Sequence, residues 1–227
     1  MAFLVSRLEL GPARVVADVG AGTGKLARLL VPTGARVLAV EPLAEMREVL
    51  AARSPSVEVL AGSAEQLPLG DASVDAVTVA QAFHWFDAPA ALLELGRVLR
   101  PGGALAVLFN IRDLGDPLQE ELNGLLRPYH AGQPSEHEQP WRADVDASPL
   151  FGAGEHRSFT WVQPHSREEL VERVASISFV AALEPEVRAQ LLERVLGLVG
   201  ERGEPFPFRY RTDVQVFPRS RDQGAEG

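Results

Sequence analysis

Short apolar runs alternate with segments of helical spacing through the first half of the chain. Apolar runs that stop at glycine, proline or an acidic residue are typical of buried strands. Such strands are predicted over residues 14–19, 35–40, 57–60, 74–80 and 104–109. Helices are predicted between them over 24–31, 43–53 and 89–99, with a turn at 100–103. This alternation with short connections favours a parallel sheet that helices cover on both faces.

The second half has a weaker pattern. Helices are predicted over 117–127, 166–176 and from Pro185 to Gly200, and strands over 159–162 and 208–217. Residues 128–154 are rich in proline, glycine and charge, and we expect a long loop there. Because loops of this length are usually functional, we interpret it as a mobile lid that excludes water. The polar tail over 219–227 is expected to lack regular structure.

Composition removes several classes of protein. The chain has 227 residues, no cysteine and a net charge of −9, from 22 basic and 31 acidic residues. The absence of cysteine excludes disulfides and thiolate chemistry, and the negative charge disfavours nucleic acid as a partner. No apolar run approaches a membrane span, and the start MAFLVSRL is too short for a signal peptide. The sequence therefore predicts a cytoplasmic protein with no membrane association.

A glycine loop is the strongest local signal. The segment Asp18–Gly24 reads DVGAGTG, follows a predicted strand and opens a predicted helix. Its glycines have G-x-G-x-G spacing with Lys25 next, so it matches neither the dinucleotide fingerprint G-x-G-x-x-G nor a P-loop. A tight strand–helix turn is the alternative interpretation. Glu41 ends the next strand, where a carboxylate could accept both hydroxyls of a ribose or simply be solvated.

Polar or unusual segments also follow the third, fourth and fifth predicted strands. They are residues 62–65, 81–86 and 110–112. The carboxyl ends of parallel strands meet at one edge of an open sheet, and that edge is where such sheets bind ligands. The sequence therefore predicts one ligand site at this edge.

Taken together, these motifs resemble a known family. The segments Val16–Gly24, Val40–Pro42, Gly62–Pro68, Val79–Trp85 and Leu99–Gly103 are similar to those of class I S-adenosylmethionine-dependent methyltransferases. The resemblance is strong over residues 14–110. Gln81–Phe86 resembles the subgroup that includes trans-aconitate methyltransferase, and the second half resembles it loosely. The resemblance implies an α/β, Rossmann-like, open and mostly parallel twisted sheet with helices on both faces and a final antiparallel strand.

The resemblance also implies an organisation and a cofactor. We expect one methyltransferase domain over 1–218, with a cofactor-binding core over 14–110 and a helical acceptor cap over 111–200. S-adenosylmethionine is the expected cofactor. The positions implied to surround it are Asp18, Gly20, Ala21, Gly22, Thr23, Gly24, Glu41, Pro42, Met46, Ser63, Ala64, Glu65, Gln81 and Ala82.

The methyl acceptor is less defined. We expect a small organic molecule methylated on the oxygen of a carboxylate or hydroxyl. His84 is the candidate base or orienting group, with a bystander role as the alternative. Trp85, Arg112 and Trp141 are candidate acceptor contacts, although Trp85 and Phe86 could be core aromatics, the preferred interpretation for Phe86, and Trp141 could anchor the loop.

Other readings stay open. The five histidines show no H-x-H or HExxH spacing, so no metal is expected. The alternatives to a methyltransferase are a cofactor-binding module without turnover and an NAD(P)-dependent reductase. The sequence does not predict the oligomeric state.

Overall fold

The computed structural model describes residues 1–129, 141–200 and 202–220, and its described part divides into two compact units. The first unit contains residues 1–109, 141–157 and 213–220. The second unit contains residues 110–129, 158–200 and 202–212. Each unit has its own apolar core, so each is described separately.

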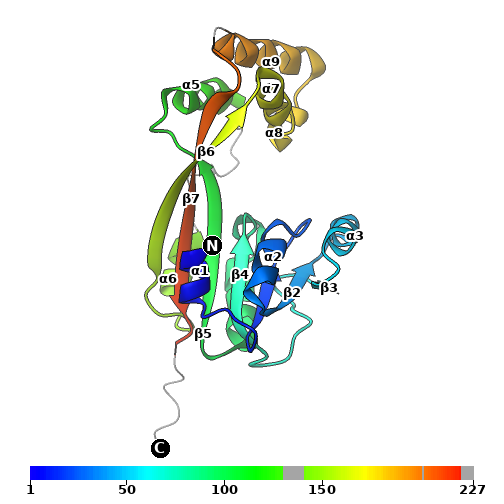
Figure 1. The fold of residues 1–227 in the computed structure, drawn as a ribbon, viewed down its shortest axis with the longest axis vertical. Coiled ribbons are helices and arrows are strands. Elements are labelled where there is room, and N and C mark those ends of the chain that lie inside the picture. The colour runs from blue at the N-terminus through cyan, green and yellow to red at the C-terminus, as the bar shows by residue number, and fades with distance from the viewer. Residues whose placement is uncertain (130–140, 201, 221–227) are drawn as a thin grey trace, which may run out of the picture. The chain divides into compact units, whose positions relative to one another are not determined.

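Within the described residues, seven strands form one sheet in the order β3-β2-β1-β4-β5-β7-β6 (Figure 1). Their bounds are β1 Val15–Val19, β2 Arg36–Glu41, β3 Glu58–Ala61, β4 Val74–Ala80, β5 Leu99–Arg112, β6 Glu155–His165 and β7 Phe206–Pro218. The pairs β1–β2, β1–β4, β2–β3 and β4–β5 are parallel. The C-terminal strands are antiparallel, which confirms the predicted Rossmann-like architecture.

The core of the first unit lies between the parallel strands and their helices. The helices are α1 Ala2–Arg7, α2 Lys25–Leu30, α3 Ala44–Arg53, α4 Ala88–Val98 and α6 Trp141–Ala147. Val37 of β2, Leu30 of α2 and Leu50 of α3 belong to one buried cluster. All of β4 except Ala80 is buried, which explains its continuous apolar sequence. This packing brings the ends of β1, β2 and β4 to one edge.

The second unit is mainly helical. It contains α5 Pro117–Leu126, α7 Arg167–Ala175, α8 Ser178–Ala181 and α9 Pro185–Val199. Leu122, Leu170 and Leu191 belong to its buried core. The predicted capping box is confirmed, because Ser166 and Glu169 bond each other's backbone N–H at the start of α7.

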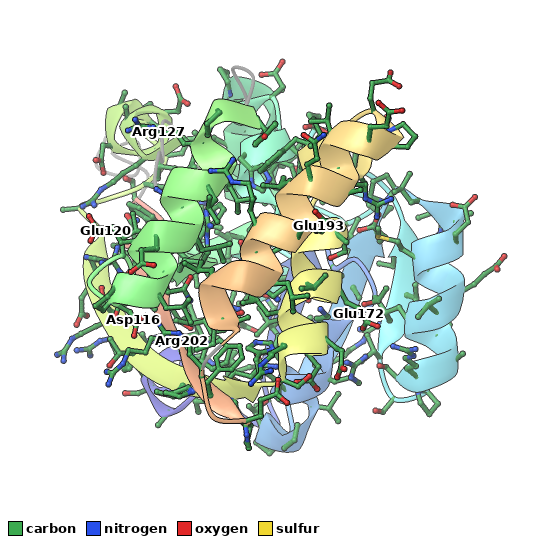
Figure 2. The ribbon with its side chains drawn as sticks, turned by 90° about the horizontal axis from the view of Figure 1, so that it is seen from above. Asp116, Glu120, Arg127, Glu172, Glu193 and Arg202 are labelled. Carbon is green, nitrogen blue, oxygen red and sulfur yellow. The ribbon has the colours of Figure 1, made fainter. Side chains whose placement is uncertain are left out.

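The outer faces of these helices are polar. Figure 2 shows Glu120 of α5, Glu172 of α7 and Glu193 of α9 directed away from the ribbon, and all three are exposed. The helices are therefore amphipathic, with leucine and valine on the buried side and charge on the other.

The structure corrects several predicted elements. Residues 100–103 are not a turn before the fifth strand. Val74 pairs with Leu99 and Ala76 with Ala104, so these residues form a bulge inside β5. The predicted loop over 128–154 is wrong for residues 141–147, which form α6, while residues 130–140 lie outside the described part. Strand β6 is longer than predicted, and the sequence reading missed α1 and α8.

No helix within residues 1–129, 141–200 or 202–220 combines the length and apolar character that crossing a bilayer requires.

Candidate functional site

A left-handed glycine loop joins β1 to α2. Gly20, Gly22 and Gly24 have φ angles of 68°, 56° and 78°, a region that side chains with a Cβ rarely adopt. Gly20 has a second constraint, because an added Cβ would lie 2.7 Å from the Cβ of Ala82. At Gly22, the only atom of the described residues that an added Cβ would meet is the Sδ of Met46, at 3.8 Å. The protein itself therefore leaves space beside Gly22 into which a ligand can fit.

The carboxylate of Glu41 braces this loop from the adjacent strand. Its Oε2 accepts the backbone N–H of Gly22 at 2.8 Å, and its Oε1 accepts the N–H of Leu43 at 3.0 Å. The residue is only 5% exposed. A carboxylate has about four lone-pair positions, so two further donors can bind Glu41. The interpretation of Glu41 as a solvated loop acid is wrong.

Arg47 fixes the chain on the other side of Glu41. One guanidinium nitrogen donates to the carbonyl oxygens of Glu41 at 2.9 Å and of Pro42 at 2.6 Å. Sequence reasoning missed this residue. The available signal was the position of Arg47 near the start of a predicted helix, where a cation opposes the helix dipole and therefore needs another partner. The exposed side chains of Leu43 and Met46 lie on the same segment.

Asp18 lies under the loop at the end of β1. It is 1% exposed, and its Oδ1 accepts the hydroxyl of Thr78 from β4 at 2.8 Å. Its Oδ2 has no hydrogen-bond partner among the described residues. Burial raises the pKa of Asp18 to about 7, and the bond from Thr78 only partly opposes that rise. The carboxyl is therefore poised between its neutral and charged forms.

The segment after β4 closes against the glycine loop. Gln81 has a φ of 57°, which is rare for a residue with a side chain. Ala82 and Phe86 both contact the space beside Gly20. The short 3-10 helix η2 (Phe83–Trp85) lies between them. His84 and Trp85 are thus held between two residues that touch the glycine loop.

The rings in η2 differ sharply in exposure. Phe83 is 1% exposed and Trp85 is 76% exposed. The core alternative for Trp85 is therefore wrong, and the preferred core interpretation of Phe86 is also wrong, because Phe86 is only half-buried. The His84 ring lies 4.7 Å from the Trp85 ring and 5.7 Å from that of Phe109, measured between centroids. Partial burial lowers the pKa of His84 below its ordinary value.

Trp141 anchors α6 in the first unit. It is 3% exposed, and its ring stacks on Phe109 at 5.6 Å and packs on Phe83 at 5.3 Å. Its indole N–H has no hydrogen-bond partner among the described residues. This packing matches the anchoring alternative.

The segment after β3 contacts the start of α4. Ser63 pairs with Gln66 in an isolated bridge, and Ala64 is buried. The Oε1 of Glu65 accepts the backbone N–H of Asp87 at 3.1 Å, at the start of α4. Glu65 therefore links the segment after β3 to the helix that follows η2.

Arg112 lies in the second unit, at the end of β5. Its guanidinium donates to the Oδ1 of Asn123 on α5 at 3.2 Å. In the same unit, Thr212 donates to Asn110 at 2.6 Å and accepts from the indole of Trp161 at 3.0 Å.

Among the residues that the structure describes, no three histidine or acidic side chains gather closely enough to hold a metal ion.

Comparison with known proteins identifies the family. The profile of the family "Methyltransferase domain" matches residues 17–107. An uncharacterized methyltransferase of Mycobacterium tuberculosis is 40% identical over 187 residues, which are 82% of this chain and 74% of that protein. A malonyl-[acyl-carrier protein] O-methyltransferase of Serratia marcescens is 37% identical over 116 residues, 48% of this chain and 45% of that one.

Solved structures agree with these relatives. The structure of an Anaeromyxobacter dehalogenans protein assigned as a type II methyltransferase covers 96% of this chain and 94% of its own. Its TM-score is 0.69 and its sequence is 26% identical. The family match covers the glycine loop, Glu41 and the segment after β4 that the geometry brings to one sheet edge. The chain belongs to the class I S-adenosylmethionine-dependent methyltransferases.

Proposed function

We propose that this chain transfers a methyl group from S-adenosylmethionine to an oxygen atom of a small organic acceptor. Membership of the family implies the cofactor. The observation that carries the proposal is the buried carboxylate of Glu41 bonded to the N–H of Gly22, at the ends of adjacent strands.

The residues at this edge fit the cofactor. Glu41 would accept the two ribose hydroxyls while keeping its bonds to the backbone. The backbone at Gly22 would pass close to the ligand, since Met46 alone among the described residues approaches that space. Met46, 39% exposed, would cover one face of the adenine. Asp18, Gln81 and Ala82 would lie beside the methionine part, and Ser63–Glu65 beside the adenine.

The bound cofactor supplies a methyl group on a positively charged sulfur, with a neutral thioether as leaving group. The protein then has to place the acceptor oxygen in line with that methyl. The segment Gln81–Phe86 suits this task, because Ala82 and Phe86 hold it against the glycine loop. His84 would take the proton from a hydroxyl acceptor or donate a hydrogen bond to a carboxylate.

Two observations support a small oxygen acceptor. The net charge of −9 disfavours polyanionic nucleic acid, whose binding depends on neutralising phosphates. The partial relative from Serratia marcescens is named as an O-methyltransferase, and the segment Gln81–Phe86 resembles the trans-aconitate methyltransferase subgroup. Family membership favours this reaction over hydride transfer.

Calorimetry with S-adenosylhomocysteine, the demethylated product, tests the cofactor site directly. Glu41→Ala removes charge-assisted hydrogen bonds worth about 1.5–3 kcal/mol, so affinity should fall roughly tenfold to a hundredfold. Glu45→Ala, an exposed acid on α3, is the matched control and should leave affinity unchanged. Binding of NADH instead of S-adenosylhomocysteine would overturn the proposal.

A methyl-transfer screen tests the acceptor class. It should include small carboxylic acids, alcohols, phenols, amines and bulk RNA. We expect turnover on acids or hydroxyl compounds. Turnover on RNA alone would reject the small acceptor. Tight binding of S-adenosylhomocysteine with no turnover on any substrate class would favour a cofactor-binding module without catalysis.

A further inference from the structure

Trp85 presents a large apolar surface next to His84. The indole is 76% exposed. His84 makes ring contacts with Trp85 and Phe109, but the described residues give it no hydrogen bond or ion pair. Scattered surface aromatics need no explanation, but this pair lies beside the proposed methyl-transfer site. Both side chains are exposed and are therefore accessible to a ligand.

The position of this pair is fixed by its neighbours in sequence. Ala82 and Phe86, on either side of η2, both lie against Gly20 in the glycine loop. Beneath His84, the ring of Phe109 stacks on buried Trp141. The pair is thus carried on a rigid aromatic base and held at the glycine loop. Its exposed surface is available to an acceptor.

The chemistry of the pair selects among oxygen acceptors. A carboxylate acceptor is already an anion and needs a cation to hold it, whereas a phenol has to lose a proton as it reacts. Partial burial lowers the pKa of His84, which favours the neutral form of its imidazole. A neutral imidazole can accept a proton but offers no charge to a carboxylate. An indole face also packs well on a flat ring.

We propose that the acceptor is a phenol-type compound whose ring lies on Trp85 and whose hydroxyl faces His84. This inference rests on the proposed function and specifies its substrate class. As the bond between the phenol oxygen and the methyl carbon forms, the carbon–sulfur bond breaks and its electron pair stays on sulfur. The phenol proton passes to a ring nitrogen of His84, and His84 then releases it to water.

Binding measurements separate this inference from the cofactor proposal. S-adenosylhomocysteine binding is measured first by calorimetry, and its absence would defeat the proposed function. With that ligand bound, 2-naphthol is titrated as the probe. Cyclohexanol, a hydroxyl compound without a flat aromatic ring, and cyclohexanecarboxylate, which carries a negative charge, are the controls. We expect 2-naphthol to bind more tightly than both. Tighter binding of cyclohexanecarboxylate, with S-adenosylhomocysteine still bound, would overturn the phenol proposal alone.

Variants assign the two roles. Trp85→Leu should weaken 2-naphthol binding about tenfold, because an exposed tryptophan is a typical binding hot spot, and should leave S-adenosylhomocysteine affinity unchanged. Trp161→Leu, a partly exposed tryptophan of the second unit, is the matched control. His84→Gln should keep 2-naphthol binding but slow its methylation about a hundredfold. Equal binding by Trp85→Leu and the wild type, or full turnover by His84→Gln, would overturn the proposal.

Discussion

An ideal Cβ placed on Gly20 would lie 2.7 Å from the Cβ of Ala82, closer than such atoms approach in proteins. The turn after β1 and the segment after β4 are therefore in contact at the level of the backbone. This contact fixes η2, with His84 and Trp85, relative to the glycine loop. Methyl transfer requires such a fixed geometry, because small misplacements of the reacting atoms are costly.

Substitutions at two glycines should separate packing from ligand binding. Gly20→Ala adds a clash to an unfavourable φ, and we expect it to lose at least about 2 kcal/mol of unfolding free energy. Gly22→Ala faces only the unfavourable φ, about 1 kcal/mol, but its methyl fills the space proposed for the cofactor. Urea denaturation and calorimetry with S-adenosylhomocysteine measure the two effects. This division would be contradicted if both variants lost the same unfolding free energy and Gly22→Ala bound S-adenosylhomocysteine as tightly as the wild type.

Asp18 should make stability depend on pH. Its pKa is about 7 in the folded chain against an ordinary value of 3.8, because burial disfavours the charged form. A folded-state pKa above the unfolded value means that its stabilising contribution is complete below about pH 4 and is lost as pH rises to about 7. Asp18→Asn stays neutral. As pH rises from about 4 to about 7, the wild type should therefore lose unfolding free energy relative to Asp18→Asn. Above about pH 7 the difference between the two proteins should stay constant.

Asp75→Asn is the control for this experiment. Burial acts to raise the pKa of Asp75, but the N–H of Val15 and the guanidinium groups of Arg100 and Arg14 hold it below its ordinary value. Its contribution is lost only as pH falls below about 4. Urea denaturation at several pH values should show a constant difference for Asp75→Asn between pH 5 and 7. A constant difference for Asp18→Asn as well would show that Asp18 is charged throughout.

Arg47 should support cofactor affinity without touching the methyl site. It donates to the carbonyl oxygens of Glu41 and Pro42, and each such bond contributes about 1 kcal/mol. Arg47→Ala should therefore weaken S-adenosylhomocysteine binding several-fold in calorimetry, because the segment carrying Glu41 loosens. Arg53→Ala, an exposed arginine in the last turn of α3, should not. The same affinity in both variants would remove Arg47 from this role.

The indole N–H of Trp141, which has no hydrogen-bond partner among the described residues, offers a further test. A buried donor without a partner costs about 1–3 kcal/mol. Trp141→Phe removes that donor along with some packing, so its net change in unfolding free energy should stay within about 1 kcal/mol. Trp141→Ala leaves a cavity between Phe83 and Phe109 and should cost about 3–5 kcal/mol. Equal losses in the two variants, measured by urea denaturation, would show that the N–H has a partner.

The sequence predicts the parallel sheet well, because its signal is local. β4 matches its predicted bounds of 74–80. β1 begins one residue later than predicted, and β2 is shifted by one residue at each end. The placement of Glu41 beside the glycine loop also follows from the pattern, since adjacent parallel strands end at the same edge, whereas the bond from Gly22 to Glu41 was not predicted.

Other features have no local signal. Phe83, His84, Trp85 and Phe86 are consecutive rings, and only tertiary packing decides that Phe83 is buried while Trp85 is exposed. Helix α6 has only Trp141 and Val145 as buried residues, too few for a periodic pattern. Most of β6 is exposed, so its sequence lacks the alternation of apolar and polar residues that marks strands.

The division of the chain constrains how this protein can evolve. The backbone passes between the two units four times, and residues 141–157 of the first unit lie between parts of the second in sequence. No single contiguous segment therefore contains all of one unit and nothing of the other. A recombination event that exchanged residues 110–212 would also replace Trp141 and the aromatic base beneath His84.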